Sequence, residues 1–512
     1  INTLSSEPQI VTDSCDDPSM LYAVPLRIAV SALLILPVAF SIPAAGFTCN
    51  ALNDDAKRAM KAWQVPGMAL GVVEGGQIIL RRTYGIRDTD NRLPVTTGTV
   101  FGTGSLTKSF TALGIAIAAA EGRLSIDRPV RQLLDYFPGD VTLRHLLSHT
   151  SGWPRHDALW YLDSYDRQEL PRRLAMLPRF AKGGDAFQYN NVPFAVAGIA
   201  LSAATGKTWN DWIAAEILDK VGMMETVTTL AGFRQTRNRA SPYFPAAEGR
   251  ISLPLRDTDP VAPAAGLYAS INDMLKYTQA LAGNGIIDGR RALPAAAVNS
   301  LTAREAGSYG LGLRLSSWHG QRLAFHPGFI DGYGARLSLL PDRKSGVIVL
   351  TNMSGETPVA RIVSQIALDC LTAAPRTDWI AHFGGGRKPQ KPKPPSSATI
   401  APDRLPHTYT GHYIHPAYGP VSFTATVETP SLIGRFHGRE FELSYAGNDS
   451  WRLADTHWPL REGLIFSFSG LAGGEFGTVS APIADGPTYR RNAGPLVFHR
   501  EPLSSPAPTP DK

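Results

Sequence analysis

The chain carries a serine and a lysine three residues apart at the start of its most apolar segment. Residues 102–122 read GTGSLTKSFTALGIAIAAAEG, in which Ser105 and Lys108 precede a run that is apolar on every side and predicts a buried helix. A spacing of three places both side chains on one helical face. Burial and a helix N-terminus both favour a neutral amine, which can take a proton from the hydroxyl. The pair therefore has the chemistry of an activated nucleophile, although S-x-x-K alone is a common pattern.

A second segment supplies polar groups that complement this pair. Tyr189 and Asn191 lie in FQYNNVPFA, in a turn before an apolar helix. Two side chains that are two residues apart in an extended turn point to the same side. A tyrosinate beside an ammonium can accept a proton, and the amide can hold Lys108 or a substrate carbonyl. An ordinary turn and helix cap is the alternative interpretation of this segment taken alone.

The third segment, FHPGFIDGYG at 325–334, is predicted to begin a hairpin. Gly328 on a strand permits close approach by a substrate, and the N–H of Phe329 would complete an oxyanion hole with the N–H of Ser105. His326 offers a donor or a switchable charge toward a carboxylate or a leaving group. A glycine-containing bend with an exposed histidine is the alternative here.

In this order the three motifs resemble those of the penicillin-recognising serine enzymes, whose signature is S-x-x-K, Y-x-N or S-x-N, and K-T-G or H-x-G. The likeness is to the group of class C β-lactamases and D-alanyl-D-alanine carboxypeptidases (peptidase S12), which includes esterases and D-aminopeptidases, and it covers roughly 50–375. The resemblance implies that Ser105 is the acylated nucleophile and Lys108 its proton partner. It makes Tyr189 the general base and Asn191 a contact to substrate or lysine.

The third motif departs from the K-T-G of true β-lactamases. His326 stands in place of the lysine and Pro327 in place of the hydroxyl residue, which are the groups that would hold a β-lactam carboxylate. Phe329 is also bulky beside the expected oxyanion site. We therefore expect a serine hydrolase that forms an acyl-enzyme with ester, amide or D-amino-acid peptide carbonyls and needs no metal or organic cofactor. A true β-lactamase, a D,D-carboxypeptidase and a penicillin-binding sensor without turnover are the alternatives.

Other catalytic motifs are weak or missing in the sequence. His145 and His149 have the i,i+4 spacing of a helical zinc pair, but the glutamate of the metalloprotease motif is not between them. The chain has no G-x-S-x-G elbow of an α/β-hydrolase and no Walker-type phosphate loop. We therefore expect no metal site.

The apolar patterning predicts an α+β fold of the β-lactamase/transpeptidase type. Residues 67–88 and 335–352 alternate and turn like β-hairpins, and mostly helical sequence lies between them. An antiparallel sheet assembled from both ends, with an inserted helical region, follows from this order. Amphipathic helices at 50–64 and 357–373 are expected to cover the sheet.

Composition divides the chain into five parts. Residues 1–46 are expected to be an N-terminal extension and a signal peptide, approximately Met20–Gly46, which predicts export to the periplasm or the outside. The hydrolase domain is expected at 47–383 and a Pro/Lys-rich linker at 384–404. Short alternating segments over 405–501 predict a small all-β barrel that resembles lipocalin-like domains. Residues 502–512 are expected to be a disordered tail.

Charge indicates which classes of molecule the protein binds, and the cysteine content indicates whether it has a disulfide. The 512 residues carry a net charge of +6, with a local excess in GGGRKPQKPKPP that indicates a solvated linker rather than a nucleic-acid surface. We expect a small-molecule or peptide substrate, no nucleic acid and no stable membrane span after signal removal; the oligomeric state is left open. Cys49 and Cys370 would remain after export as an even pair, and either a disulfide or two unrelated buried cysteines fits them.

Overall fold

The structure is a computed structural model. It describes residues 49, 51–161, 165–246, 249–354, 357–386, 402–426, 431–453, 464–481 and 495–501. The predicted signal peptide, most of the predicted linker and the predicted tail lie outside the described residues.

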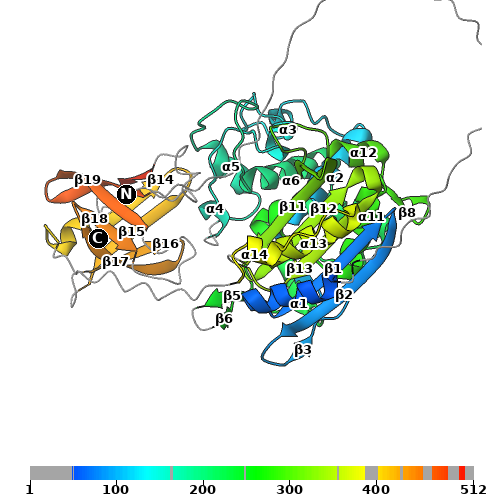
Figure 1. The fold of residues 1–512 in the computed structure, drawn as a ribbon. Coiled ribbons are helices and arrows are strands. Elements are labelled where there is room, and N and C mark those ends of the chain that lie inside the picture. Colours follow the sequence, from blue (N-terminus) through cyan, green and yellow to red (C-terminus); the bar gives the residue numbers. More distant parts are fainter. Residues whose placement is uncertain are drawn as a thin grey trace, which may run out of the picture. The chain divides into compact units, whose positions relative to one another are not determined.

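A seven-stranded antiparallel sheet organises the first part of the chain, in the order β10-β11-β12-β13-β1-β2-β3 (Figure 1). Both predicted hairpins are confirmed, and the turn of the first uses Gly75 and Gly76 at positive φ. Strand β1 pairs with β13, so the two ends of this region meet in one sheet as predicted. The strands are β1 (Gly67–Glu74), β2 (Gln77–Asp88), β3 (Leu93–Pro94), β10 (Arg314–Trp318), β11 (Gln321–Ile330), β12 (Tyr333–Leu340) and β13 (Ser345–Thr351).

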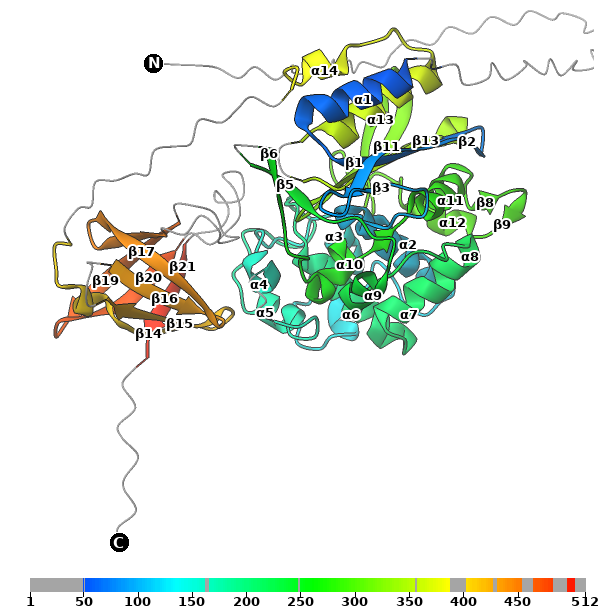
Figure 2. The same cartoon turned by 90° about the horizontal axis from the view of Figure 1, so that it is seen from below.

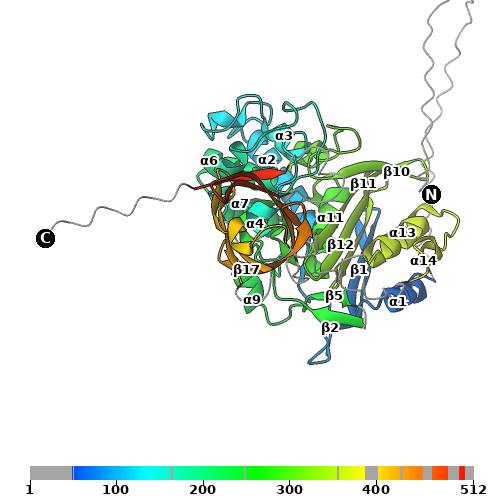
Figure 3. The same cartoon turned by 90° about the vertical axis from the view of Figure 1, so that its left-hand side faces the viewer.

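Helices cover both faces of this sheet. Helix α13 (Val359–Thr372) packs on β12 and β13, and α1 (Leu52–Trp63) lies beside it on the same face, whereas α11 (Ile271–Ala282) packs on β1 and β13 from the other side (Figures 2 and 3). Strand β1 shows the consequence, because Leu70 belongs to the core under α1 and α13 and Ala69 to the core under α11. Because both faces of β1 are buried, its sequence GMALGVV is nearly continuously apolar.

The inserted region is helical and holds the predicted nucleophile. Ser105 lies in the 3-10 turn η1 (Gly104–Leu106), one turn ahead of α2 (Thr107–Ala120), rather than inside the α-helix. Helices α2 and α6 (Val192–Thr205) contact each other and α7 (Trp209–Ile213), which explains why both are apolar on every side. The other elements of the region are η2 (Val130–Gln132), α3 (Leu143–Leu147), α4 (Ala158–Tyr161), α5 (Leu170–Ala175), η3 (Ala214–Leu218), α8 (Asp219–Val221), α9 (Leu230–Gln235), η4 (Asp259–Val261), α10 (Ala262–Ala265) and α12 (Ala295–Ser300), with the short strands β4 (Phe101–Gly102), β5 (Tyr243–Ala246), β6 (Gly249–Ser252), β7 (Tyr268–Ala269), β8 (Ile286–Ile287) and β9 (Arg290–Arg291).

The C-terminal part forms a closed antiparallel barrel, which confirms the predicted all-β module. Aromatic side chains that alternate along its strands fill the interior, among them Phe423, Trp451 and Phe468. The strands are β14 (Gly411–His415), β15 (Gly419–Ala425), β16 (Ser431–Phe436), β17 (Arg439–Gly447), β18 (Ser450–Leu453), β19 (Ile465–Ala472), β20 (Glu475–Ala481) and β21 (Leu496–Arg500). The remaining elements are η5 (Pro341–Arg343), α14 (Trp379–His382) and η6 (Pro406–Tyr409).

A disulfide joins Cys49 to Cys370 in the structure. It ties the segment three residues ahead of α1 to the last turn of α13, so the two helices that share one face of the sheet are also linked covalently. Within the described ranges, every helix is too short or too polar to cross a bilayer.

Candidate active site

Strand β11 lies directly against the turn that carries Ser105. A Cβ added to Gly104, whose φ is +52°, would stand 2.7 Å from the backbone of Phe329, and a Cβ added to Gly328 would stand 2.1 Å from the carbonyl oxygen of Thr103. Both glycines are therefore required for contact between two parts of the same chain. We had expected the space at Gly328 to admit a substrate, whereas the structure fills it with the Thr103 carbonyl. The contact brings the backbone of Phe329 beside the residue that precedes Ser105.

Lys108 is fully buried and makes three polar contacts. Its Nζ lies 3.1 Å from Ser105 Oγ, 2.6 Å from Asn191 Oδ1 and 3.1 Å from the carbonyl oxygen of Ala264. Burial holds the pKa of Lys108 well below its ordinary value; Asp157 raises it and nearby arginines lower it further. A neutral amine has two hydrogens and one lone pair. The amide and carbonyl oxygens can only accept, so the lone pair points at the Ser105 hydroxyl.

Tyr189 contacts the same hydroxyl from the other side. Its Oη lies 2.8 Å from Ser105 Oγ. Burial raises the pKa of Tyr189 to about 12, although the hydrogen bond with Ser105 and the charges of Arg155 and Arg314 lower it. The phenol is therefore protonated at neutral pH. We had expected a tyrosinate that accepts a proton. The environment instead favours a proton donor at Tyr189 and an acceptor at Lys108.

A buried carboxylate that we did not predict orients Asn191. The Asn191 Nδ2 donates to both oxygens of Asp157, at 3.1 and 2.9 Å, so its Oδ1 faces Lys108. Burial alone would raise the pKa of Asp157, but the charge of Arg155 and hydrogen bonds from Trp160, Arg155 and Asn191 hold it below its ordinary value. Asp157 is therefore ionised inside the protein, and its negative charge favours the ammonium form of Lys108.

We expect Asp157→Asn to shift the acid limb of the kcat/KM profile to lower pH by about one unit. Removal of the carboxylate withdraws a charge that stabilises the ammonium, so the pKa of Lys108 falls further. The measurement is kcat/KM against pH, with the exposed Asp135→Asn as the matched control. A shift to higher pH, or the same shift in the control, would contradict this role of Asp157.

His326 is buried and lies at one end of a hydrogen-bonded chain. Its Nδ1 is 2.6 Å from the Pro327 carbonyl oxygen, which can only accept, so Nδ1 carries the proton and Nε2 accepts from Tyr309 Oη at 2.9 Å. The Tyr309 oxygen in turn accepts from His149 Nε2 at 3.2 Å, and His149 Nδ1 accepts from the N–H of Asn190. Burial lowers the pKa of both histidines well below the ordinary value. We had expected His326 to offer a switchable charge, but both of its nitrogens have partners within the chain and the ring is neutral.

The two histidines with the i,i+4 spacing have different partners in the structure. His145 caps α3, where its Nδ1 accepts from the N–H of Thr142, and His149 belongs to the chain that ends at His326. The described residues contain no group of three or more His, Cys, Asp or Glu side chains placed to bind a metal ion.

The first two predicted motifs meet at the Ser105 hydroxyl, and the third packs against the turn that carries it. Asp157 and Tyr309 are two further residues that contact these motifs. Neither of these two residues is predictable from a local motif. Asp157 is 34 residues from its partner Asn191. Tyr309 is 17 residues from its partner His326. The only local signal was the placement of Asp157 a few residues after the HTSGWP segment. Phe329 is half exposed, and it is its backbone that lies against Gly104 beside the site.

Comparison with known proteins agrees with this geometry. Residues 52–369, more than half of the chain, match the family described as Beta-lactamase. The chain belongs to the Beta-lactamase family. Members of this family are serine hydrolases, and the protein is accordingly an enzyme of this class.

Individual relatives support the same family. The chain is 27% identical over 408 residues to "Unguisins hydrolase ungD'" from Aspergillus campestris, which covers 71% of this chain and 75% of that protein. It is 28% identical over 310 residues to a D-aminopeptidase from Cereibacter sphaeroides, which covers 56% and 57%. The structure of the octameric penicillin-binding protein homologue from Pyrococcus abyssi superimposes with a TM-score of 0.56 at 22% identity, over 88% of this chain and 99% of that one, and shows the fold.

Proposed function

We propose that this protein is an exported serine hydrolase that forms an acyl-enzyme on Ser105 with ester, amide or D-amino-acid peptide carbonyls. One observation carries the proposal: the Ser105 hydroxyl is within hydrogen-bonding distance of both a buried, neutral amine and a buried, protonated phenol. The amine of Lys108 is a base and the phenol of Tyr189 an acid, so one oxygen has both partners that acyl transfer needs. Export rests on the signal-peptide pattern of Met20–Gly46.

In the acylation half-reaction, Lys108 takes the Ser105 proton while Oγ attacks the substrate carbonyl carbon. The N–H groups of Ser105 and Phe329 stabilise the oxyanion that develops. When the intermediate collapses, the bond to the leaving group breaks, and Tyr189 protonates the departing nitrogen or oxygen. This leaves an ammonium at Lys108 and a phenolate at Tyr189.

Deacylation reverses these transfers. Water gives a proton to the Tyr189 phenolate and attacks the acyl carbon. The Ser105 oxygen then departs and takes the proton held by Lys108, which restores all three groups. In acylation Lys108 gains a proton and Tyr189 loses one, and in deacylation the reverse occurs, so the protons balance. No metal or organic cofactor enters either step.

Three observations support substrates other than β-lactam antibiotics. The third motif is His-Pro-Gly, and the lysine and the hydroxyl that would hold a β-lactam carboxylate are absent from it. The neutral His326 directs both nitrogens into the protein. Two relatives are named as a hydrolase of unguisins and a D-aminopeptidase. The side-by-side rates on a nitrophenyl ester, a D-Ala-D-Ala peptide and a chromogenic cephalosporin distinguish these substrate classes.

We expect Ser105→Ala to abolish both turnover and covalent labelling by a fluorophosphonate, since the variant has no oxygen to acylate. The measurement is labelling followed by intact-mass analysis, with the exposed Ser125→Ala as control. Full activity in Ser105→Ala would end the proposal. Stoichiometric acylation of the unmodified protein without release over hours would instead favour the sensor.

A further inference from the structure

Three arginines converge on a cavity behind strand β11. The cavity has a volume of about 600 Å³, and Arg314, Arg336 and Arg361 line it together with aromatic side chains. The cavity lies on one face of β11, because successive side chains of a strand point to opposite faces. Phe325 packs on the core under α1 and α13, and Pro327 and Phe329 follow it on that face. His326 and Gly328 lie on the other face, toward the turn of Ser105. The cavity therefore lies on the face of β11 opposite the catalytic serine.

Arg336 is the unusual member of this group. Its side chain is 6% exposed, and its Nε is buried with no hydrogen-bond partner. The guanidinium lies 4.5 Å from the centre of the Phe325 ring and forms no ion pair with any described residue. Burial lowers the pKa of Arg336 to about 9, and the charges of Arg361 and Arg314 contribute. A buried guanidinium is ordinarily paired, and no described residue supplies an anion to Arg336.

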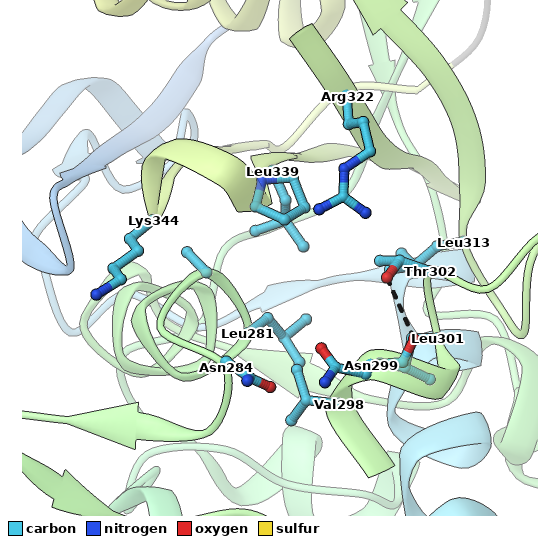
Figure 4. A pocket seen from close by; sticks show the side chains of 12 residues that line it. Leu281, Asn284, Val298, Asn299, Leu301, Thr302, Leu313, Arg322, Leu339 and Lys344 are labelled. Atoms are coloured by element: carbon cyan, nitrogen blue, oxygen red, sulfur yellow. Dashed lines mark hydrogen bonds between the residues drawn. The ribbon is translucent and has the colours of Figure 1, made fainter. Parts of the chain in front are cut away.

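The described residues that line the cavity provide no such anion. None of its lining side chains is acidic, and Arg314 and Arg361 likewise form no ion pair in the part of the chain that the structure describes. A second cavity, of about 260 Å³, offers a contrast (Figure 4). It also has basic side chains, but its Arg322 donates to both carboxylate oxygens of Asp342, at 2.9 and 2.5 Å. An arginine of β11 is thus paired with a carboxylate at one cavity, whereas Arg336 of the neighbouring strand β12 has no such partner among the described residues at the other.

We propose that the cavity between β11 and α13 binds an organic anion, a carboxylate or phosphate carried on an apolar body, through Arg336, Arg361 and Arg314. A planar guanidinium binds either oxyanion through two parallel hydrogen bonds. The aromatic rings of Trp63, Phe325 and Phe383 line the same space and suit an apolar or aromatic body. This site is separate from the acyl-enzyme chemistry and does not depend on it.

Arg314 connects the two sites. Its guanidinium lies 5.7 Å from the centre of the Tyr189 ring while it also lines the cavity. An anion bound there would partly neutralise a charge that lowers the pKa of Lys108 and of Tyr189. The pKa values of both groups would then rise, and the acid limb of the kcat/KM profile would move to higher pH.

Calorimetric titration of the full-length protein tests this site. The probes are 3-phenylpropionate, phenyl phosphate and the neutral 3-phenylpropionamide. We expect the two anions to bind and the amide not to bind. The anion with the higher affinity indicates whether the site prefers a carboxylate or a phosphate. Arg336→Met and Arg361→Gln should each weaken anion binding by about 10-fold or more. Arg322→Gln, on the neighbouring strand β11, and Lys108→Met, on the opposite face of β11, should leave anion binding unchanged.

The outcomes separate this site from other causes of binding. Arg336→Met removes an unpaired buried charge, so its Tm should be no lower than that of the unmodified protein. A loss of anion binding with a preserved Tm therefore supports the site. Equal binding by Arg336→Met, binding of the neutral amide with the same affinity, or loss of binding in Lys108→Met would each overturn it.

Discussion

Replacement of Lys108 by methionine is expected to lower kcat/KM by about 10³-fold or more on every substrate class. Methionine fills a similar space in the buried site but offers no lone pair to the Ser105 hydroxyl, 3.1 Å away. Its free energy of unfolding should change little, because loss of a buried amine is favourable while Asn191 and Ala264 lose a donor. The measurements are steady-state kinetics and a denaturant unfolding curve on the same preparation.

Two further variants test whether the loss of activity is due to the loss of a neutral amine at this position. Lys108→Arg should be as inactive as Lys108→Met, since a guanidinium retains its charge and cannot take the proton. The exposed Lys220→Met should behave as the unmodified protein. In the unmodified protein, kcat/KM should rise with pH through a pKa well below the ordinary value for lysine, because only the unprotonated form acts. Activity of Lys108→Arg above one tenth of the unmodified rate would contradict Lys108 as the base.

Replacement of Tyr189 by phenylalanine should affect amides far more than activated esters. We expect the acylation rate on a peptide amide to fall by about 10²- to 10³-fold and that on a nitrophenyl ester by less than about 10-fold. An amine leaves only when it is protonated, whereas nitrophenolate leaves as the anion. The phenylalanine ring retains the packing against His149, whose centre lies 4.3 Å from that of Tyr189. Burst-phase kinetics measure acylation separately from deacylation.

The ratio of the two losses decides the role of Tyr189. An equal loss on ester and amide would show that the phenol removes the Ser105 proton, as the sequence alone had suggested. A control in Tyr136→Phe, at a tyrosine distant from the site, should leave both rates unchanged. The high pKa of Tyr189, about 12, predicts that activity on amides persists to alkaline pH before the donor is lost.

The layers of the fold were largely predictable because their signals are local. The strand pairs β1–β2 and β12–β13 follow from alternation around turn residues, and the barrel from short alternating segments. The sheet joins β1 to β13, and that joining was inferred from strands at both ends of a helical region. The position of Ser105 in a 3-10 turn ahead of α2 was not predicted, because the composition of the segment is equally compatible with one continuous helix.

The sequence alone predicts which groups belong to the site: the serine, lysine, tyrosine and histidine motifs, in their order along the chain. The tertiary structure decided what each group can do. Burial holds the pKa of Lys108 low and that of Tyr189 high, while the charges of residues 155 and 314 lower both pKa values and that of residue 157 raises both. Burial lowers the pKa of His326 well below its ordinary value, and Tyr309 and the Pro327 carbonyl are the partners of its two nitrogens. A proton equilibrium depends on the surroundings of a group in three dimensions, and no spacing of residues along the chain specifies those surroundings.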